Sequence, residues 1–145
     1  MILVDANLLL YAYDSSSPFH GKARTWWENT LSATEAVRLS WQTVLAFVRV
    51  STNPRVLVAP LSPARALSHV DTWLEVPTVE ILQPGVQHWA LFKQLIAAIG
   101  TAANLTMDAH LAALAIEHGC TLCSTDTDFA RFEGLRCINP LRAKG

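Results

Sequence analysis

Residues 105–128, LTMDAHLAALAIEHGCTLCSTDTD, combine a helical pattern, a glycine and a strand-like run within one short stretch. Leucines and alanines recur at helical spacing up to Gly119, a residue that commonly ends a helix. We expect Thr106 to cap this helix at its start. The apolar run at residues 121–124 predicts a strand, and acidic residues follow it directly. A helix that leads straight into a strand is typical of α/β domains.

Strand-like runs alternate with helical patterns along the whole chain. Short strands are expected at residues 2–4, 36–40, 78–82, 121–124 and 135–140. Helices are expected at residues 6–13, 21–33, 41–52, 61–77, 85–100 and 105–119, with Ser62 as a cap and Pro63 in a first turn. Because helical crossovers repeat between the strands, this order predicts an α/β fold with a mainly parallel sheet. No internal repeat or long linker divides the chain, so we expect a single domain over residues 1–145.

The composition is typical of a compact domain. The chain has 145 residues, of which 51% are hydrophobic and 16% are charged. A chain of this length buries about 70% of its unfolded surface. Its net charge of -1 gives no global basic field, which argues against tight, non-specific binding of a polyphosphate. It does not argue against a nuclease, because active-site acids lower the net charge and bound cations offset them locally.

Cysteine content and hydropathy indicate a cytoplasmic protein without a membrane span. The three cysteines have no framework spacing, and the Cys120–Cys123 pair lacks a second pair or nearby histidines that would complete a zinc site. We therefore expect buried thiols. The sequence contains no run of roughly 20 apolar residues, so no transmembrane helix is predicted. Asp5 interrupts the N-terminal apolar run, which argues against a signal peptide.

Four aspartates fall at one edge of the predicted sheet. Asp5 directly follows the first strand, and Asp126 and Asp128 follow the fourth. Asp108 lies in the first turn of a helix that runs antiparallel to these strands. Because the carboxyl ends of parallel strands share one edge, where ligands bind, we expect these side chains to converge. Clustered carboxylates repel one another, and oxygen ligands without nearby histidine or cysteine favour a hard ion such as Mg²⁺ or Mn²⁺.

Each aspartate also has a local explanation that the sequence leaves open. Asp108 is favourable near a helix N-terminus because of the helix dipole. Asp128 is placed to cap the short helix expected within residues 126–132, and Asp126 suits a turn. Asp5 is the hardest to explain locally, because it stands between an apolar strand and an apolar helix.

Three stretches of the chain resemble the PIN-domain ribonucleases, particularly the toxin half of VapBC-type toxin–antitoxin pairs. They are VDANLLLYA (residues 4–12), SWQTVLAFVRVSTNPRV (40–56) and DAHLAALAIEHGCTLCSTDTDFARFEGLRCINPL (108–141). The last stretch is long and specific. The resemblance implies a three-layer α/β/α sandwich, endonucleolytic cleavage of RNA that depends on Mg²⁺ or Mn²⁺, and neutralisation by a cognate antitoxin protein.

The resemblance also implies which residues form the site. Asp5 matches the first metal-binding, catalytic acid of the family, Asp108 the third and Asp126 the fourth. Asn7 matches a polar residue beside the first acid, and Ser124 matches a hydroxyl that orients the site. The supporting residues expected on this basis are Asn7, Ser124 and Asp128.

The chain departs from the family pattern at its second acid. Many members carry glutamate in the helix after the second strand, where this chain has Ala46 and no other acid. This leaves open a catalytically weak or inactive module that binds RNA or an antitoxin. An aspartyl-phosphate phosphatase is disfavoured, because Asn7 stands where a second acid is needed.

Other polar and aromatic residues allow a functional and a structural interpretation. Arginine pairs well with phosphate, but arginines can equally be solvated charges. Trp26 and Trp27 could stack on bases or pack in the core. The histidines are scattered singly, which favours structural roles. Apolar helices leave surface for a homodimer or a partner helix. The arginines and histidines concerned are Arg49, Arg55, Arg131, His20, His69, His88, His110 and His118.

Overall fold

The computed structural model describes residues 1–142, so the last three residues of the predicted domain, 143–145, lie outside the described residues. Within them, five strands form one sheet in the order β3-β2-β1-β4-β5, and every neighbouring pair is parallel. The prediction of a parallel sheet is therefore confirmed. The strands are β1 (Ile2–Val4), β2 (Val37–Ser40), β3 (Val79–Leu82), β4 (Thr121–Cys123) and β5 (Cys137–Ile138).

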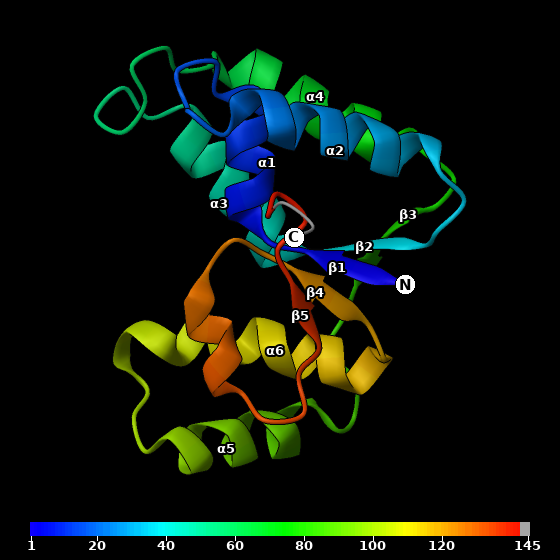
Figure 1. Cartoon of the computed structure of the whole chain (residues 1–145), viewed down its shortest axis with the longest axis vertical. Coiled ribbons are helices and arrows are strands. Elements are labelled where there is room, and N and C mark those ends of the chain that lie inside the picture. The colour runs from blue at the N-terminus through cyan, green and yellow to red at the C-terminus, as the bar shows by residue number, and fades with distance from the viewer. Residues whose placement is uncertain (143–145) are drawn as a thin grey trace.

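Helices cover both faces of the sheet, which gives the expected three-layer α/β/α sandwich (Figure 1). One layer holds α1 (Ala6–Tyr13), α2 (His20–Ser32), α3 (Trp41–Ser51) and α4 (Pro63–Glu75). The other holds α5 (His88–Ile99), α6 (Thr106–His118) and the 3₁₀ turns η1 (Ala103–Leu105) and η2 (Thr127–Arg131). No helix in residues 1–142 is both long and apolar enough to cross a membrane.

Alternation along the central strand explains the two cores. In β1, Ile2 and Val4 face the layer of α1 to α4, whereas Leu3 faces α6 together with Leu122 of β4. Leu3, Val4 and Leu122 are completely buried. Successive side chains of a strand point to opposite faces, so a continuous apolar run is needed wherever both faces are covered.

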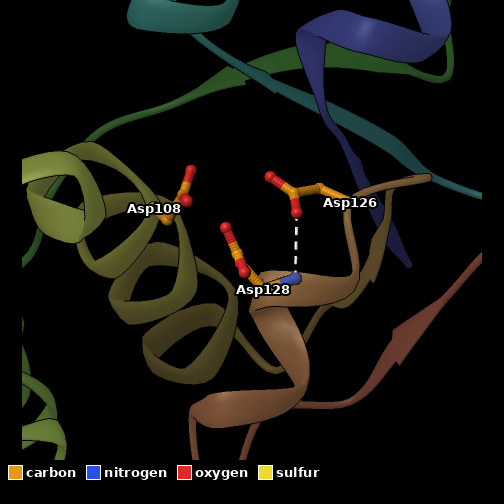
Figure 2. A group of neighbouring side chains, drawn as sticks. All are labelled: Asp108, Asp126 and Asp128. Carbon is orange, nitrogen blue, oxygen red and sulfur yellow. Dashed lines mark hydrogen bonds between the residues drawn. The ribbon is translucent and has the colours of Figure 1, made fainter.

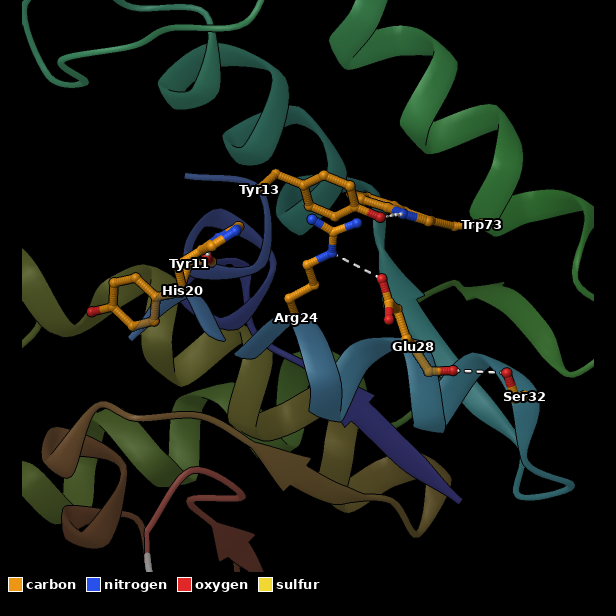
Figure 3. A network of polar contacts seen from close by, with 7 residues as sticks. All are labelled: Tyr11, Tyr13, His20, Arg24, Glu28, Ser32 and Trp73. Atoms are coloured by element: carbon orange, nitrogen blue, oxygen red, sulfur yellow. Dashed lines mark hydrogen bonds and ion pairs between the residues drawn. The ribbon is translucent and has the colours of Figure 1, made fainter. Parts of the chain in front are cut away.

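An aromatic cluster packs α2, α3 and α4 together. The Trp27 and Trp73 rings meet edge to face at a centroid distance of 5.7 Å, and Phe47 lies 4.7 Å from Trp73. Trp73 Nε1–H donates to the Tyr13 hydroxyl at 2.8 Å (Figure 3). Trp27 is 1% exposed, so for this residue the core interpretation is confirmed. Part of α3 faces outward, since Leu45 is 64% exposed.

The ends of α4, α5 and α6 follow the expected chemistry with one exception. Ser62 accepts a hydrogen bond from Arg65 N–H at the start of α4, and Gly100 and Gly119 end α5 and α6 in the left-handed conformation. The expectation that Thr106 caps α6 is wrong. The turn η1 leads directly into α6, so Thr106 already has helical dihedral angles and makes no side-chain cap.

Glu117 ties the end of α6 to the loop between β3 and α5. Its carboxylate accepts hydrogen bonds from Gly85 N–H at 2.7 Å and Gln87 N–H at 2.8 Å. A Cβ atom at residue 85 would lie 2.6 Å from Glu117 Oε2, so a larger residue there would displace the Glu117 carboxylate. These bonds hold the pKa of Glu117 below its usual value.

Glu117→Ala is expected to destabilise the chain by about 1–2 kcal/mol, because two charge-assisted hydrogen bonds are lost. Hydrogen exchange at the amides of Gly85 and Gln87 should accelerate, and urea denaturation measures the global effect. Glu133→Ala is the matched control, since Glu133 is exposed and has no hydrogen bond within residues 1–142. Equal exchange rates in the two variants would contradict this role of Glu117.

Candidate metal centre

The pairing of β1 with β4 brings Asp5 beside Ser124. Asp5 N–H donates to the carbonyl of Cys123 at 3.0 Å, which continues the strand pairing one residue past β1. The buried Ser124 hydroxyl donates to Asp5 Oδ2 at 2.7 Å, and the other carboxylate oxygen accepts from Ala6 N–H at 2.8 Å. Two donors therefore hold the Asp5 carboxylate in one orientation at the start of α1.

Ser124 is the centre of a wider polar network. Its hydroxyl oxygen accepts from Asp126 N–H at 3.0 Å and lies 3.4 Å from Asn7 Nδ2. Asn7 Oδ1 is buried and has no hydrogen-bond partner within residues 1–142. This network links both strand ends, and the amide oxygen of Asn7 stays available for a ligand.

Three carboxylates, those of Asp108, Asp126 and Asp128, point toward one another (Figure 2). One oxygen each from Asp108, Asp126 and Asp128 lies within 4.8 Å of the others. Asp108 is in the first turn of α6, whereas Asp126 and Asp128 stand at the start of η2. The connection from α6 to β4 thus brings Asp108 close to Asp126 and Asp128, which lie 18 and 20 residues further along the chain. This is expected for acids at one edge of a sheet.

The structure changes the roles of two aspartates relative to expectation. Asp128 does not cap the short helix: Asp126 does, by accepting a hydrogen bond from Asp128 N–H at 2.9 Å. The chain leaves β4 in an extended conformation at Asp126, which is the geometry of a cap, so Asp128 is already inside the turn. Its carboxylate is therefore free to join the group. Asp5 lies outside the group of three but remains close enough to raise the pKa of Asp108.

The carboxylates disfavour one another's ionisation. Burial and the neighbouring charges of Asp126, Asp5 and Asp128 raise the pKa of Asp108 to about 6. Burial also raises the pKa of Asp5, an effect that the hydrogen bond from Ser124 opposes and the charge of Asp126 reinforces. No lysine or arginine within residues 1–142 forms an ion pair with any of these four acids. Among the described residues, the negative charge of the site is therefore not neutralised by an ion pair.

The residues present fit a hard divalent cation. Carboxylate and amide oxygens are the donors, and neither histidine nor cysteine joins the group. A bound cation would compensate charges that otherwise repel. The residues available to hold it are Asp108, Asp126, Asp128, Asp5 and Asn7.

Other residues considered from the sequence lie apart from the acids or add no charge to them. His110 Nδ1 lies 2.9 Å from His88 Nε2 in the contact between α5 and α6. Arg131 lines a cavity beside α5 rather than the acidic group. Ala46 is half-buried in α3, and the helix contains no acid in its place.

Two residues near the acids were not among those expected from the sequence. Asn139 and Arg142 line a cavity that also contains Ser124 and Asp126. No local motif marks them. Their position after β5, beside β4, could have been found only by placing the last strand next to the acids in a parallel sheet.

Asp108→Asn is expected to raise the melting temperature of the metal-free protein by about 2–4 °C near pH 7.5, since roughly 1 kcal/mol of screened repulsion disappears. Because the pKa of Asp108 is raised, the native state favours the protonated form of this carboxyl group. The stability that protonation contributes is complete below pH 3.8 and is lost as the pH rises through about 6. The difference should therefore vanish at low pH. Thermal denaturation in chelator measures it, with the exposed Asp71→Asn as control. A melting temperature unchanged at neutral pH would argue against the repulsion.

Comparison with known proteins identifies the family of the chain. Residues 2–135 match the family model of the PIN domain. The chain is 42% identical to ribonuclease VapC33 of Mycobacterium tuberculosis over 98% of its own length and 99% of the relative's, and 41% identical to ribonuclease VapC37 of the same organism over 97% of each.

A solved structure supports the same fold. The VapBC2 complex of Rickettsia felis, bound to a DNA fragment from its promoter, contains a chain that matches with a TM-score of 0.68 at 18% identity, covering 96% of this chain and 98% of that one. At this identity the likeness establishes the fold. Together with the family model and the close relatives, it shows that the chain belongs to the PIN domain family and, within it, to the group of the VapC ribonucleases.

Proposed function

We propose that this chain is a metal-dependent endoribonuclease that acts as the toxin of a toxin–antitoxin pair. The observation that carries the proposal is the group of carboxylates at the carboxyl edge of the sheet, with which no basic side chain of residues 1–142 forms an ion pair. Relatives that cover nearly the whole chain are named ribonucleases. The active unit is a single domain of residues 1–145.

The ion is Mg²⁺ or Mn²⁺, and its ligands come from Asp5, Asp108 and Asp126. Hard cations of this kind bind carboxylate oxygens and complete their shell with water and substrate phosphate. Asp128 and Asn7 support the site, because the Asp128 carboxylate belongs to the same group and Asn7 Oδ1 has no other partner in the described chain. When bound, such an ion activates a water for attack on a phosphodiester and offsets the charge of the leaving oxygen.

The protein groups position the acids and manage protons. The Ser124 hydroxyl donates to Asp5, and its oxygen accepts from Asp126 N–H, so one buried side chain orients two ligands. Asp128 N–H holds the Asp126 carboxylate in the same way. A bound cation would lower the pKa of Asp108 from about 6 and so favour its ionised carboxylate. Substitution of residues that orient metal ligands in this way typically lowers metal affinity or activity by about 10–100-fold.

The proposal includes two protein partners. The first is a cognate antitoxin, since solved chains with this fold occur in VapBC complexes from Rickettsia felis and Salmonella typhimurium. The second is a further copy of the chain in a homodimer. Exposed apolar side chains on α3 and α5, among them Leu45 and Trp89, leave surface for association. We propose that the protein acts in the cytoplasm, where RNA is available.

The native chain, purified without an antitoxin, is expected to cleave RNA only when Mg²⁺ or Mn²⁺ is supplied. Asp5→Asn and Asp126→Asn should each lower the cleavage rate by at least about 100-fold while the fold is retained, because a metal ligand is lost. The assay uses total RNA with mapped 5′ ends, with either metal or with chelator. Asp71→Asn is the matched control, since Asp71 is exposed on α4. Metal-independent cleavage, or full activity in both ligand variants, would refute the assignment.

A catalytically inactive PIN-fold module is the second candidate. Ala46 favours it, because the helix that carries the second acid in many relatives contains no carboxylate here. Such a module would bind RNA or an antitoxin without cutting RNA.

Ala46→Glu separates the two functions. If the native chain is an active nuclease, the substitution should change its rate by less than about tenfold, since the existing oxygen ligands already hold the ion. If the chain is an inactive module, cleavage should arise only in Ala46→Glu. The same RNA assay decides, and Ala46→Gln controls for the added volume.

A further inference from the structure

A cavity lies on the β5 side of the acidic group. It has a volume of about 230 Å³ and lies between the segment that follows β4 and the turn that follows β5. Ser124 N–H donates to the carbonyl of Ile138 at 3.0 Å, so the two segments leave the sheet side by side at the carboxyl edge. Ser124 and Asp126 line one side of the cavity, and Asn139 and Arg142 line another. The cavity is therefore contiguous with the proposed metal ligands.

The turn after β5 places Arg142 in a defined position. Asn139 Oδ1 accepts from Leu141 N–H at 3.0 Å, and Asn139 carbonyl oxygen accepts from Arg142 N–H at 3.2 Å. The Leu141 side chain packs against the core of the α1–α4 layer. These contacts hold the backbone of the turn up to Arg142, and Arg142 is among the residues that line the cavity.

Arg142 is the only lysine or arginine that lines this cavity in the described part of the chain. It forms no ion pair within residues 1–142 and is exposed. A guanidinium matches phosphate geometry with two parallel hydrogen bonds. A bound cation would neutralise the scissile phosphate of an RNA substrate. The guanidinium of Arg142 would offer positive charge to a neighbouring phosphate of the same strand.

The rest of the lining suits a nucleoside. The side-chain oxygen of Asn139 accepts a hydrogen bond within the turn. The NH₂ group of Asn139 has no acceptor within the described residues and can donate to a base or ribose. Thr125 and Thr127 supply hydroxyl groups, and Phe129 and Cys137 supply an apolar wall. Polar edges with an apolar wall are what an unstacked nucleotide of single-stranded RNA requires.

We propose that this cavity is a nucleotide-binding subsite beside the cleavage site, and that Arg142 binds a backbone phosphate of the RNA there. The inference rests on the proposed ribonuclease function and adds to it how the strand is held. It also distinguishes Arg142 from Arg131, which lines a different cavity beside α5.

The test measures RNA binding without cleavage. Each variant is made in the full chain that also carries Asp108→Asn, and binding of a labelled single-stranded RNA is followed by fluorescence anisotropy at several salt concentrations. Arg142→Ala should raise Kd by about tenfold and lower the slope of log K against log salt by about 0.7, the value for one phosphate contact in a single strand. Arg142→Lys should keep most of the slope, because it keeps the charge. Arg131→Ala is the control and should match the parent.

Two further measurements separate a substrate contact from a structural role. In the otherwise native chain, Arg142→Ala should raise KM for RNA with kcat within about twofold, because the contact positions the strand rather than reacting. Mn²⁺ affinity measured by calorimetry and the melting temperature should stay at the native values. Loss of Mn²⁺ binding or of the fold in Arg142→Ala would overturn the proposal in favour of a structural role.

The failures of the two proposals look different. If the native chain cleaves RNA and Arg142→Ala binds and cleaves it as the parent does, only the subsite is refuted. If the native chain neither binds nor cleaves RNA with either metal, the ribonuclease function fails and the subsite with it.

Discussion

Mutual repulsion among carboxylates at one edge of a parallel sheet is the constraint on which the rest of this structure depends. Parallel strands end at the same edge, so the residue after β1 and the residues after β4 are neighbours. The buried Ser124 hydroxyl donates to the Asp5 carboxylate and accepts from the backbone N–H of Asp126, so it joins the two segments that carry these acids. The fold thus holds together charges that would separate in a flexible chain, and burial together with these neighbouring charges raises the pKa of Asp108.

The two apolar layers make this arrangement possible. Fully buried residues such as Leu3 and Leu122 fix the register of the central strands, because a shift by one residue would move them to the opposite face. The edge of the sheet can then carry an unfavourable cluster, since the core supplies the stability elsewhere. In these short strands, the middle residues thus stabilise the fold, and the residues at the carboxyl ends carry the acidic group.

Charge near the site is arranged locally and is not visible in the net charge of -1. The acids are concentrated at the ends of β1 and β4 and the start of α6, whereas Arg142 reaches the same region from the turn after β5. Several other basic residues are engaged elsewhere: Arg24 pairs with Glu28, and Arg38 pairs with Glu80. A nearly neutral chain can therefore still place a group of carboxylates and an exposed arginine at one edge of its sheet.

The sequence by itself determined the strands, the helices and the parallel sheet, because these depend on local apolar periodicity and on glycine and proline positions such as Gly119 and Pro63. It also placed Asp5, Asp108 and Asp126 at one edge, since strand ends are local features. Only the tertiary structure decided that Asp126 rather than Asp128 caps η2, that Thr106 does not cap α6, and that Arg142 and Ser124 line the same cavity. These depend on how one segment enters the next and on which strand lies beside β4. Such relations arise from packing between distant segments, which no local pattern records.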